Sequence, residues 1–469
     1  VFDASNVTLR GGRLTVRAGL SQFATTIFNG RPVGAFQYQA EDGTRTPVVV
    51  TANRVWGYVN GVWTDLTNTV LTGSANQLGR MTILEFSSQT QLFITNGQDV
   101  PRVWTGTGSV STVDSTAPKF TDVCTVADRI VGIVPPYKVA WGEALTFSVW
   151  PTLNARFAAE SSDRVVAIQA FGPLGFLLFK EGSLWLGTFV GGSSASAFVL
   201  QWRKDCEGPA GPAAVCKADG VWVYMTPSGR IAATAGSSFQ WIGEGLQPYL
   251  NPETGDATAK IDTTNSHRTV AGYDPKHQEV TIWYPRTGDG GECKGIVTIS
   301  MPKPDFGLPY FACFPGVTAT PISAAMTMRL SDQQDKILAF SSVANTQKSY
   351  TMASGVGDAG VAFDGSWQTG LQAVQGMGQY RMAHLEAYLE RLAGYGTVTF
   401  KGVTSYALDI PGGTVESTGK SIDLATALVR SEIGRDLRGR YFGMRFTFTS
   451  ASKPIWLGGR LLGIPLEER

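Results

Sequence analysis

Residues 55–66 read VWGYVNGVWTDL, two short runs of aromatic and β-branched residues on either side of Asn60-Gly61. Asn-Gly between alternating runs predicts a β-hairpin, because both central residues of a type I′ turn need a positive φ. Each run carries one tryptophan, Trp56 or Trp63, which could form an aromatic binding site or pack in a core. If the unit recurs at a fixed spacing, its tryptophans belong to a repeated architecture.

Similar hairpins do recur along the chain. The other candidates are LFITNGQDVPRVW (92–104), LLFKEGSLWLGTF (177–189), ADGVWVYMTPSGRIAAT (218–234), TVAGYDPKHQEVTIWYP (269–285) and DKILAFSSVANTQKSYTM (335–352). Tryptophans at matching places are 37 to 42 residues apart. Short antiparallel strands with a period of about 40 residues are typical of propeller blades. The sequence therefore predicts an all-β chain with a divergent β-propeller of five or six blades between about residues 30 and 345. The opening stretch is then the central hairpin of an early blade, and its tryptophans pack between blades.

The composition supports an all-β protein and excludes some function classes. Charged residues make up 16% of the 469 residues, below the usual share of roughly 25%, and 55 glycines indicate many turns. The net charge of +1 argues against a high-affinity nucleic-acid binder. It is compatible with a wall past which DNA slides, where strong cationic contacts would be a handicap.

The cysteines and histidines suggest no metal site and no cofactor. Five cysteines form no disulfide framework, so assembly in a reducing cytoplasm is expected. Cys206 and Cys216 flank a short Gly/Pro-rich segment, and the sequence leaves open whether they form a disulfide. The three histidines are scattered, and no apolar run is long enough to span a membrane.

The last third of the chain differs, because the tryptophan hairpins stop after residue 350. GYGTVTFKGV (394–403), RYFGMRFTFTS (440–450) and IWLGGRLLGIPLE (455–467) predict strands of a separate β-sandwich. The segment QYRMAHLEAYLERLAG (379–394) is ambiguous, since its leucines fit a helical face while its alternation also fits a strand. Helix propensity alone favours a helix there.

Several phrases together carry a resemblance to a known family. RGGRLTVRAGLSQF (10–23) is followed in order by LFITNGQDVPRVW, VAWGEALTFSVWP, LLFKEGSLWLG and DGVWVYMTPSGRI, and the chain closes with GRDLRGRYFGMRFTFTSASKPIWLGGRLLGIPLE (434–467). This resembles the tail-hub, or tail-nozzle, proteins of short-tailed bacteriophages, also called packaged-DNA stabilisation proteins. The resemblance rests on pattern and order over nearly the whole chain, with no catalytic fingerprint.

The resemblance implies a structural virion protein. Its expected parts are an N-terminal segment (1–29) that packs on the platform, a β-propeller (30–349) and a β-sandwich platform (350–469). Six copies would form a homo-hexamer beneath the portal and the adaptor, or head-to-tail connector, protein. That ring would extend the DNA channel, retain the packaged genome and conduct double-stranded DNA at ejection without sequence specificity. The expected location is the virion tail, assembled in the host cytoplasm.

Two features of the chain bear on that resemblance. Larger relatives insert a fibre-docking domain and a long nozzle tip, for which 469 residues leave little room. Contacts with a tail fibre, spike, needle or plug protein therefore stay open. The resemblance also predicts that residues 379–403 form a strand pair.

Candidate interaction residues lie near the C-terminus. The local concentration of arginines predicts a subunit or adaptor interface at Arg435, Arg438, Arg440, Arg445 and Arg460, where guanidinium groups would pair with carboxylates. A solvated sandwich face and contact with the DNA backbone are the other interpretations.

Two rival functions stay open: a cellular propeller scaffold for protein partners, and a carbohydrate-binding or glycoside-hydrolysing propeller. Tryptophans could stack on sugars, and Asp358, Asp364, Glu386 and Glu390 could supply paired carboxylates. DAGVAFDGSW (358–367) faintly resembles the Asp-box turn of sialidases, but it occurs once. No GxSxG nucleophile motif is present. The chain is therefore expected not to be an enzyme.

Overall fold

The computed structural model describes residues 3–10, 13–86, 89–158, 162–191, 194–302, 311–329, 335–352, 357–368, 372–373, 380–389, 397–405, 415–416, 420–423, 428–431, 438–439, 441–449 and 455–465. The chain forms two compact units. The propeller unit comprises Gln22–Ile296 and Thr320–Met352, and the terminal unit comprises Val1–Ser21, Val297–Ala319 and Ala353–Arg469. These limits differ from the expected ones, since residues 22–29 group with the propeller and residues 297–319 with the terminal unit.

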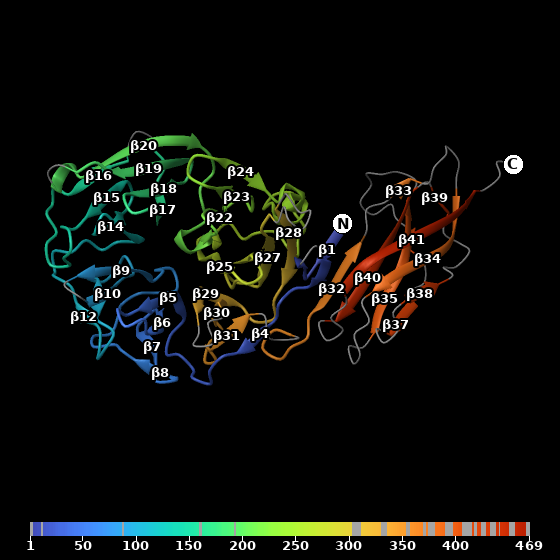
Figure 1. Cartoon of the computed structure of the whole chain (residues 1–469), viewed down its shortest axis with the longest axis horizontal. Helices are drawn as coiled ribbons and strands as arrows, with labels where there is room; N and C mark the ends of the chain where they lie inside the picture. The colour runs from blue at the N-terminus through green and yellow to red at the C-terminus, as the bar shows by residue number, and fades with distance from the viewer. Residues whose placement is uncertain are drawn as a thin grey trace. The chain divides into compact units, whose positions relative to one another are not determined.

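Seven four-stranded antiparallel sheets form the blades of a propeller (Figure 1). Blade 1 consists of β5 (Pro32–Gln39), β6 (Arg45–Thr51), β7 (Val55–Val59) and β8 (Val62–Asp65), and blade 2 of β9 (Arg80–Phe86), β10 (Gln89–Thr95), β11 (Arg102–Trp104) and β12 (Ser111–Thr112). Blade 3 consists of β13 (Val123–Val126), β14 (Arg129–Val134), β15 (Lys138–Trp141) and β16 (Ala155–Phe157), and blade 4 of β17 (Val165–Ala170), β18 (Gly175–Lys180), β19 (Ser183–Phe189) and β20 (Phe198–Asp205). Blade 5 consists of β21 (Val215–Ala218), β22 (Val221–Met225), β23 (Ile231–Thr234) and β24 (Phe239–Ile242). Blade 6 consists of β25 (Val270–Asp274), β26 (Glu279–Tyr284), β27 (Gly295–Ser300) and β28 (Ala312–Val317). Blade 7 consists of β29 (Ile322–Arg329), β30 (Asp335–Ser341), β31 (Ser349–Met352) and β4 (Leu20–Gln22).

The helices of the described residues are short and lie in the connections. They are η1 (Ser194–Ser196), η2 (Pro212–Ala214), η3 (Glu244–Leu246), α1 (Gln247–Leu250) and η4 (Ser266–Arg268).

The predicted blade count of five or six was too low, because none of the candidate hairpins lies in blade 3. Residues 123–157 form this complete blade, with Trp141 on its third strand. Blade 7 takes its fourth strand, β4, from the N-terminal part of the chain. That pairing joins the two ends of the propeller, and it is invisible to a search for consecutive hairpins.

The hairpin at residues 55–66 forms as predicted, but it lies elsewhere in its blade. Tyr58 pairs with Trp63 across the turn, and Asn60 and Gly61 have φ of 50° and 82°, as a type I′ turn requires. Because β7 and β8 are the third and fourth strands of blade 1, this is the outer hairpin and not the central one. Trp63 is 5% exposed, which confirms that it packs rather than being displayed.

Packing between adjacent blades forms the core. Trp63 of blade 1 contacts Phe28 and, across the closure, Phe340 of blade 7, with ring centroids 5.2 and 5.6 Å apart. Trp141 of blade 3 and Phe176 of blade 4 share another such cluster. Since one blade cannot cover both of its own faces, the aromatic residues of each blade are buried by its neighbour.

The described strands between Asp3 and Val16 and between Asp364 and Pro465 form two further sheets. One has the order β1 (Asp3–Ser5), β32 (Asp364–Gln368), β40 (Tyr441–Thr449), β35 (Thr397–Ser405) and β36 (Val415–Glu416), with β33 (Gln372–Ala373) on β40 and β37 (Lys420–Asp423) on β35. The other has the order β2 (Val7–Arg10), β3 (Arg13–Val16), β41 (Ile455–Pro465), β34 (Tyr380–Leu389) and β38 (Leu428–Ser431), with β39 (Arg438–Gly439) on β34.

The strand predictions for this unit can be compared residue by residue. On β40, Met444, Phe446 and Phe448 are buried while Thr447 is exposed, so the strand predicted at residues 440–450 forms with one apolar face. Residues 380–389 form a strand, so the helical alternative was wrong and pairing with β41 overrides propensity. β34 and β35 belong to different sheets, so the expected strand pair is two strands with separate partners.

Candidate functional site

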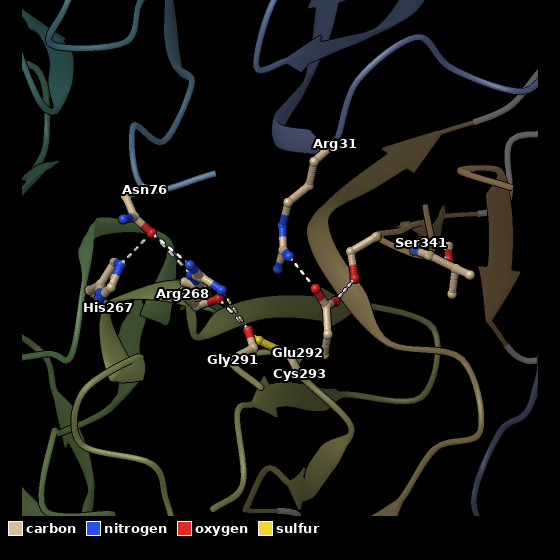
Figure 2. Close-up of polar contacts among 10 residues, drawn as sticks. Arg31, Asn76, His267, Arg268, Gly291, Glu292, Cys293 and Ser341 are labelled. Carbon is tan, nitrogen blue, oxygen red and sulfur yellow. Dashed lines mark hydrogen bonds and ion pairs between the residues drawn. The ribbon is translucent and has the colours of Figure 1, made fainter. Parts of the chain in front are cut away.

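Polar side chains gather at one mouth of the propeller channel. In an antiparallel blade, the segment entering the first strand and the loop between the second and third strands lie at the same end. Arg31 enters β5, Asn76 enters β9, and His267 and Arg268 end η4 just before β25. Glu292 lies in the loop between β26 and β27, at the same end. Figure 2 shows these side chains together.

Asn76 connects blade 2 to the chain entering blade 6. Its Oδ1 accepts hydrogen bonds from Arg268 Nε at 3.1 Å and Arg268 Nη2 at 2.8 Å, and it lies 3.2 Å from His267 Nε2. Since a guanidinium can only donate, the amide oxygen of Asn76 must face it, and His267 Nε2 then carries the proton. Arg268 Nη1 donates to the carbonyl of Gly291 at 3.2 Å.

The surroundings keep His267 neutral. Burial lowers the pKa of His267 below its ordinary value, and the positive charges of Arg268 and Arg31 lower it further. The backbone of Thr264 and the carboxylate of Asp262 act in the opposite direction, and neither outweighs burial or the charge of Arg268. The imidazole therefore lies in a region of positive potential.

A second polar group completes the mouth. Arg31 forms an ion pair with Glu292 (Figure 2). The hydroxyl of Ser342 donates to the other carboxylate oxygen. The thiol of Cys293 donates to the carbonyl of Arg268 at 3.2 Å, which links the two groups.

A cavity of about 260 Å³ lies beside Asn76. Its wall combines apolar surface from Leu78, Val166 and Pro212 with polar surface from Gln98 and His267. A concave site with apolar walls and a few convergent polar groups is the usual form of a ligand site.

A second cavity of about 520 Å³ occupies the channel itself. The first strands of all seven blades line it, and Figure 1 shows β5, β9, β17, β25 and β29 nearest the centre. Most of its lining is small or apolar, and the longer polar residues are Gln37, Arg80, Gln169 and Lys217.

The arginines predicted to form an interface lie in two sheets or outside the described residues. Arg445 lies on β40, opposite Lys401 and Gln368, and is half-buried. Arg438 on β39 lies opposite Arg381, and Arg460 on β41 lies opposite Glu386. Arg435 and Arg440 lie outside the described residues. Arg438, Arg445 and Arg460 therefore lie on three different strands, and no two of these strands pair with each other.

Of the carboxylates considered for catalysis, Asp358 is committed to a structural ion pair. It is fully buried, and its two oxygens accept from Arg17 Nη1 at 3.1 Å and Nη2 at 2.6 Å. The Arg17 guanidinium also stacks 3.8 Å from the ring centroid of Phe363. Asp364 and Glu386 lie in β32 and β34, and Glu390 lies outside the described residues.

Sequence reasoning missed the channel mouth. His267 was noted only as one of three scattered histidines, and Asn76 and Arg268 drew no attention. No local signal marks these residues, because 192 positions separate Asn76 from Arg268 and only the closed ring brings them together.

Within the described ranges, no three His, Cys, Asp or Glu side chains converge as metal ligands. No helix among those residues is long and apolar enough to cross a membrane. All five cysteines are free thiols, so Cys206 and Cys216 are not bridged.

Comparison with known proteins yields similarities of fold only. No family model matches the chain, and no curated protein matches it. Among solved structures it is similar to Raptor from Chaetomium thermophilum, with 12% identity, a TM-score of 0.48 and coverage of 72% of this chain and 30% of Raptor. It is also similar to BBS1N in a complex with ARL6DN (9% identity, TM-score 0.46, 72% and 98% coverage) and to the computationally designed Ika8 protein (11%, 0.40, 71% and 99%).

Proposed function

We propose that this protein is a structural component of a bacteriophage tail, a nozzle subunit that assembles as a homo-hexamer beneath the portal and adaptor proteins. The ring extends the DNA channel, retains the packaged genome and conducts it at ejection. In this proposal the two sheets of the terminal unit stack as a β-sandwich platform, and the chain performs no catalysis.

The observation that carries the proposal is that both ends of the chain contribute to one β unit. Asp3 pairs with Gln368, and Leu14 on β3 pairs with Trp456 on β41. The resemblance described above implies this arrangement: an N-terminal segment packs on a C-terminal platform, and the propeller lies between these two parts in the sequence. In a subunit that bears mechanical load, pairing of the N-terminal strands with the C-terminal strands keeps either end of the chain from detaching alone.

The alternating burial of β40 supports the sandwich. Trp367 stacks on Phe446 at a centroid distance of 5.1 Å, and both rings are buried. A sheet with one apolar face needs a second layer to cover it.

The size of the propeller channel supports a DNA path outside it. Its cavity of about 520 Å³ has the volume of a small-molecule site. The major groove of B-DNA alone is about 12 Å wide, so duplex DNA cannot follow the channel of one propeller. In the proposed ring, DNA runs along the axis between subunits, past chains whose 39 basic and 38 acidic residues nearly cancel.

Electron cryo-microscopy of the full chain, alone and mixed with portal and adaptor proteins, tests the proposal. A six-fold ring on the channel axis is expected. A chain that stays monomeric in both preparations refutes the proposal, and saccharide binding or hydrolysis on a glycan array would favour the rival carbohydrate function.

The predicted interface has its own test. Replacing Arg435, Arg438, Arg440, Arg445 and Arg460 by glutamine should weaken ring formation or adaptor docking. The matched control replaces two exposed propeller arginines, Arg45 and Arg203, and should leave assembly unchanged. Equal assembly of the five-residue variant and the control would show that the interface lies elsewhere.

A further inference from the structure

The oxygen of one side-chain amide at the channel mouth receives more donors than an amide can satisfy. Asn76 Oδ1 has two lone pairs, yet Arg268 Nε, Arg268 Nη2 and His267 Nε2 all lie within 3.2 Å of it. A carboxylate offers about four acceptor positions on two oxygens, and it takes the Nε and Nη2 donors of a guanidinium one on each oxygen. The donor set therefore matches a carboxylate better than the amide now present.

The same mouth provides a direct comparison. Arg31, the other arginine there, does receive a carboxylate, from Glu292, and Ser342 donates to that carboxylate as well. Figure 2 shows the two arginines on separate partners. Arg268 thus has the donor geometry of an arginine–carboxylate pair with a neutral amide in place of the acid.

The occupant is a side chain on an exposed turn, so displacing it requires rotation of the Asn76 side chain alone. Asn76 is exposed and lies between β8 and β9, where residues 66–79 contain no regular secondary structure. Its backbone N–H bonds only locally, to Ser74 Oγ at 3.2 Å. The cavity of about 260 Å³ next to Asn76 can admit a small acid or an acidic side chain.

The charges around the site favour an anion. Arg268 and Arg31 both act on His267 as positive charges, and Asp262 is the carboxylate that opposes them. Glu292 faces Arg31 and is neutralised by it. Among the described residues, no acid forms an ion pair with Arg268. A carboxylate bound next to His267 could therefore pair with the Arg268 guanidinium.

We propose that Arg268 and His267 form a carboxylate-binding site whose resting occupant is Asn76. An incoming carboxylate displaces the Asn76 amide, takes Arg268 Nε and Nη2 on its two oxygens and accepts from His267. The ligand is a carboxylate, from either a free small acid or an aspartate or glutamate side chain of a protein segment. The site lies within the propeller unit and does not depend on ring formation.

Histidine NMR offers a direct readout, because the chain contains only three histidines. The full chain with ¹³C-labelled histidine rings is titrated with sodium acetate, against sodium chloride at equal ionic strength. The His267 resonance, assigned with His267→Gln, should shift saturably with acetate and not with chloride. Because a bound anion favours the imidazolium, acetate should also raise the pH at which His267 titrates.

Variants of the occupant sharpen the test, and they replace an exposed residue that the fold does not require. Asn76→Ala should tighten acetate binding by about tenfold or more, because no amide competes. Asn76→Asp should abolish the acetate response and raise the titration midpoint of His267, because the acid is then built in. Arg268→Lys should weaken acetate binding, whereas the control Arg31→Lys should not.

The source of the carboxylate is distinguished by two peptides, Ac-Ala-Asp-Ala-NH₂ and its Asn counterpart. Response to acetate alone supports a free acid as ligand, and response to the Asp peptide but not the Asn peptide supports a protein side chain. If neither probe shifts His267 in folded Asn76→Ala, or if Asn76→Asp leaves its titration unchanged, the proposal is refuted.

Discussion

Asp122 connects three blades of the propeller, and its replacement should be costly. Its side chain is fully buried just before β13 of blade 3. Oδ1 accepts from Arg80 Nε of blade 2 at 2.6 Å, and Oδ2 accepts from the backbone N–H of Ile168 in blade 4 at 2.9 Å. Burial raises the pKa of Asp122 although Arg80 opposes the shift.

Asp122→Ala leaves the Arg80 guanidinium and the Ile168 amide without their acceptor. Removing one partner of a buried ion pair costs about 3–5 kcal/mol. At about 2 °C per kcal/mol, near the lower end of the range for large domains, the unfolding midpoint should fall by roughly 6–10 °C. Asp122→Asn keeps an acceptor and removes the desolvation penalty of the charge, so it should cost only about 1–2 kcal/mol.

Thermal unfolding followed by circular dichroism measures these changes. Asp335→Asn breaks the more exposed pair with Arg329, and it should leave the midpoint nearly unchanged. A double-mutant cycle with Arg80→Met should show a coupling of about 1–3 kcal/mol. The reasoning fails if Asp122→Ala behaves like the surface control, or if the effects of the two buried replacements simply add.

Three further predictions concern single residues of the propeller unit. Trp63→Ala should cost about 3–5 kcal/mol in denaturant unfolding because it opens the contact between blades 1 and 7, whereas Trp202→Ala, at a side chain 52% exposed, should change little. Because the pKa of His267 is lowered in the folded state, the folded protein binds fewer protons there than the unfolded chain. The stabilisation from neutral His267 is therefore present above pH 6.5, the ordinary pKa of histidine, and is lost as the pH falls. Between about pH 7 and pH 5, the free energy of unfolding should decline less steeply in His267→Gln than in the wild type. Cys124 and Cys293 are 6% and 0% exposed, and burial raises the pKa of both thiols, that of Cys293 to about 12. Ellman's reagent should therefore not label these two thiols until the chain unfolds. Rapid labelling of all five thiols in the folded chain would contradict this prediction.

The local features of the fold could be predicted from the sequence because neighbouring residues encode them. Asn60-Gly61 adopts the positive φ angles that its turn requires, and the alternation in residues 441–449 matches the burial of β40. Turn geometry and a period of two depend only on residues a few positions apart.

The tertiary structure decided what no local pattern contains. β4 closes blade 7 with residues that precede blade 1, a pairing that no search for consecutive hairpins can find. Residues 380–389 form a strand because β41 pairs with them, against their helical propensity. Asn76 meets His267 and Arg268 only after the ring has closed. Sequence alone thus determined the repeating unit, whereas closure, strand partners and the polar mouth depend on contacts between residues up to hundreds of positions apart.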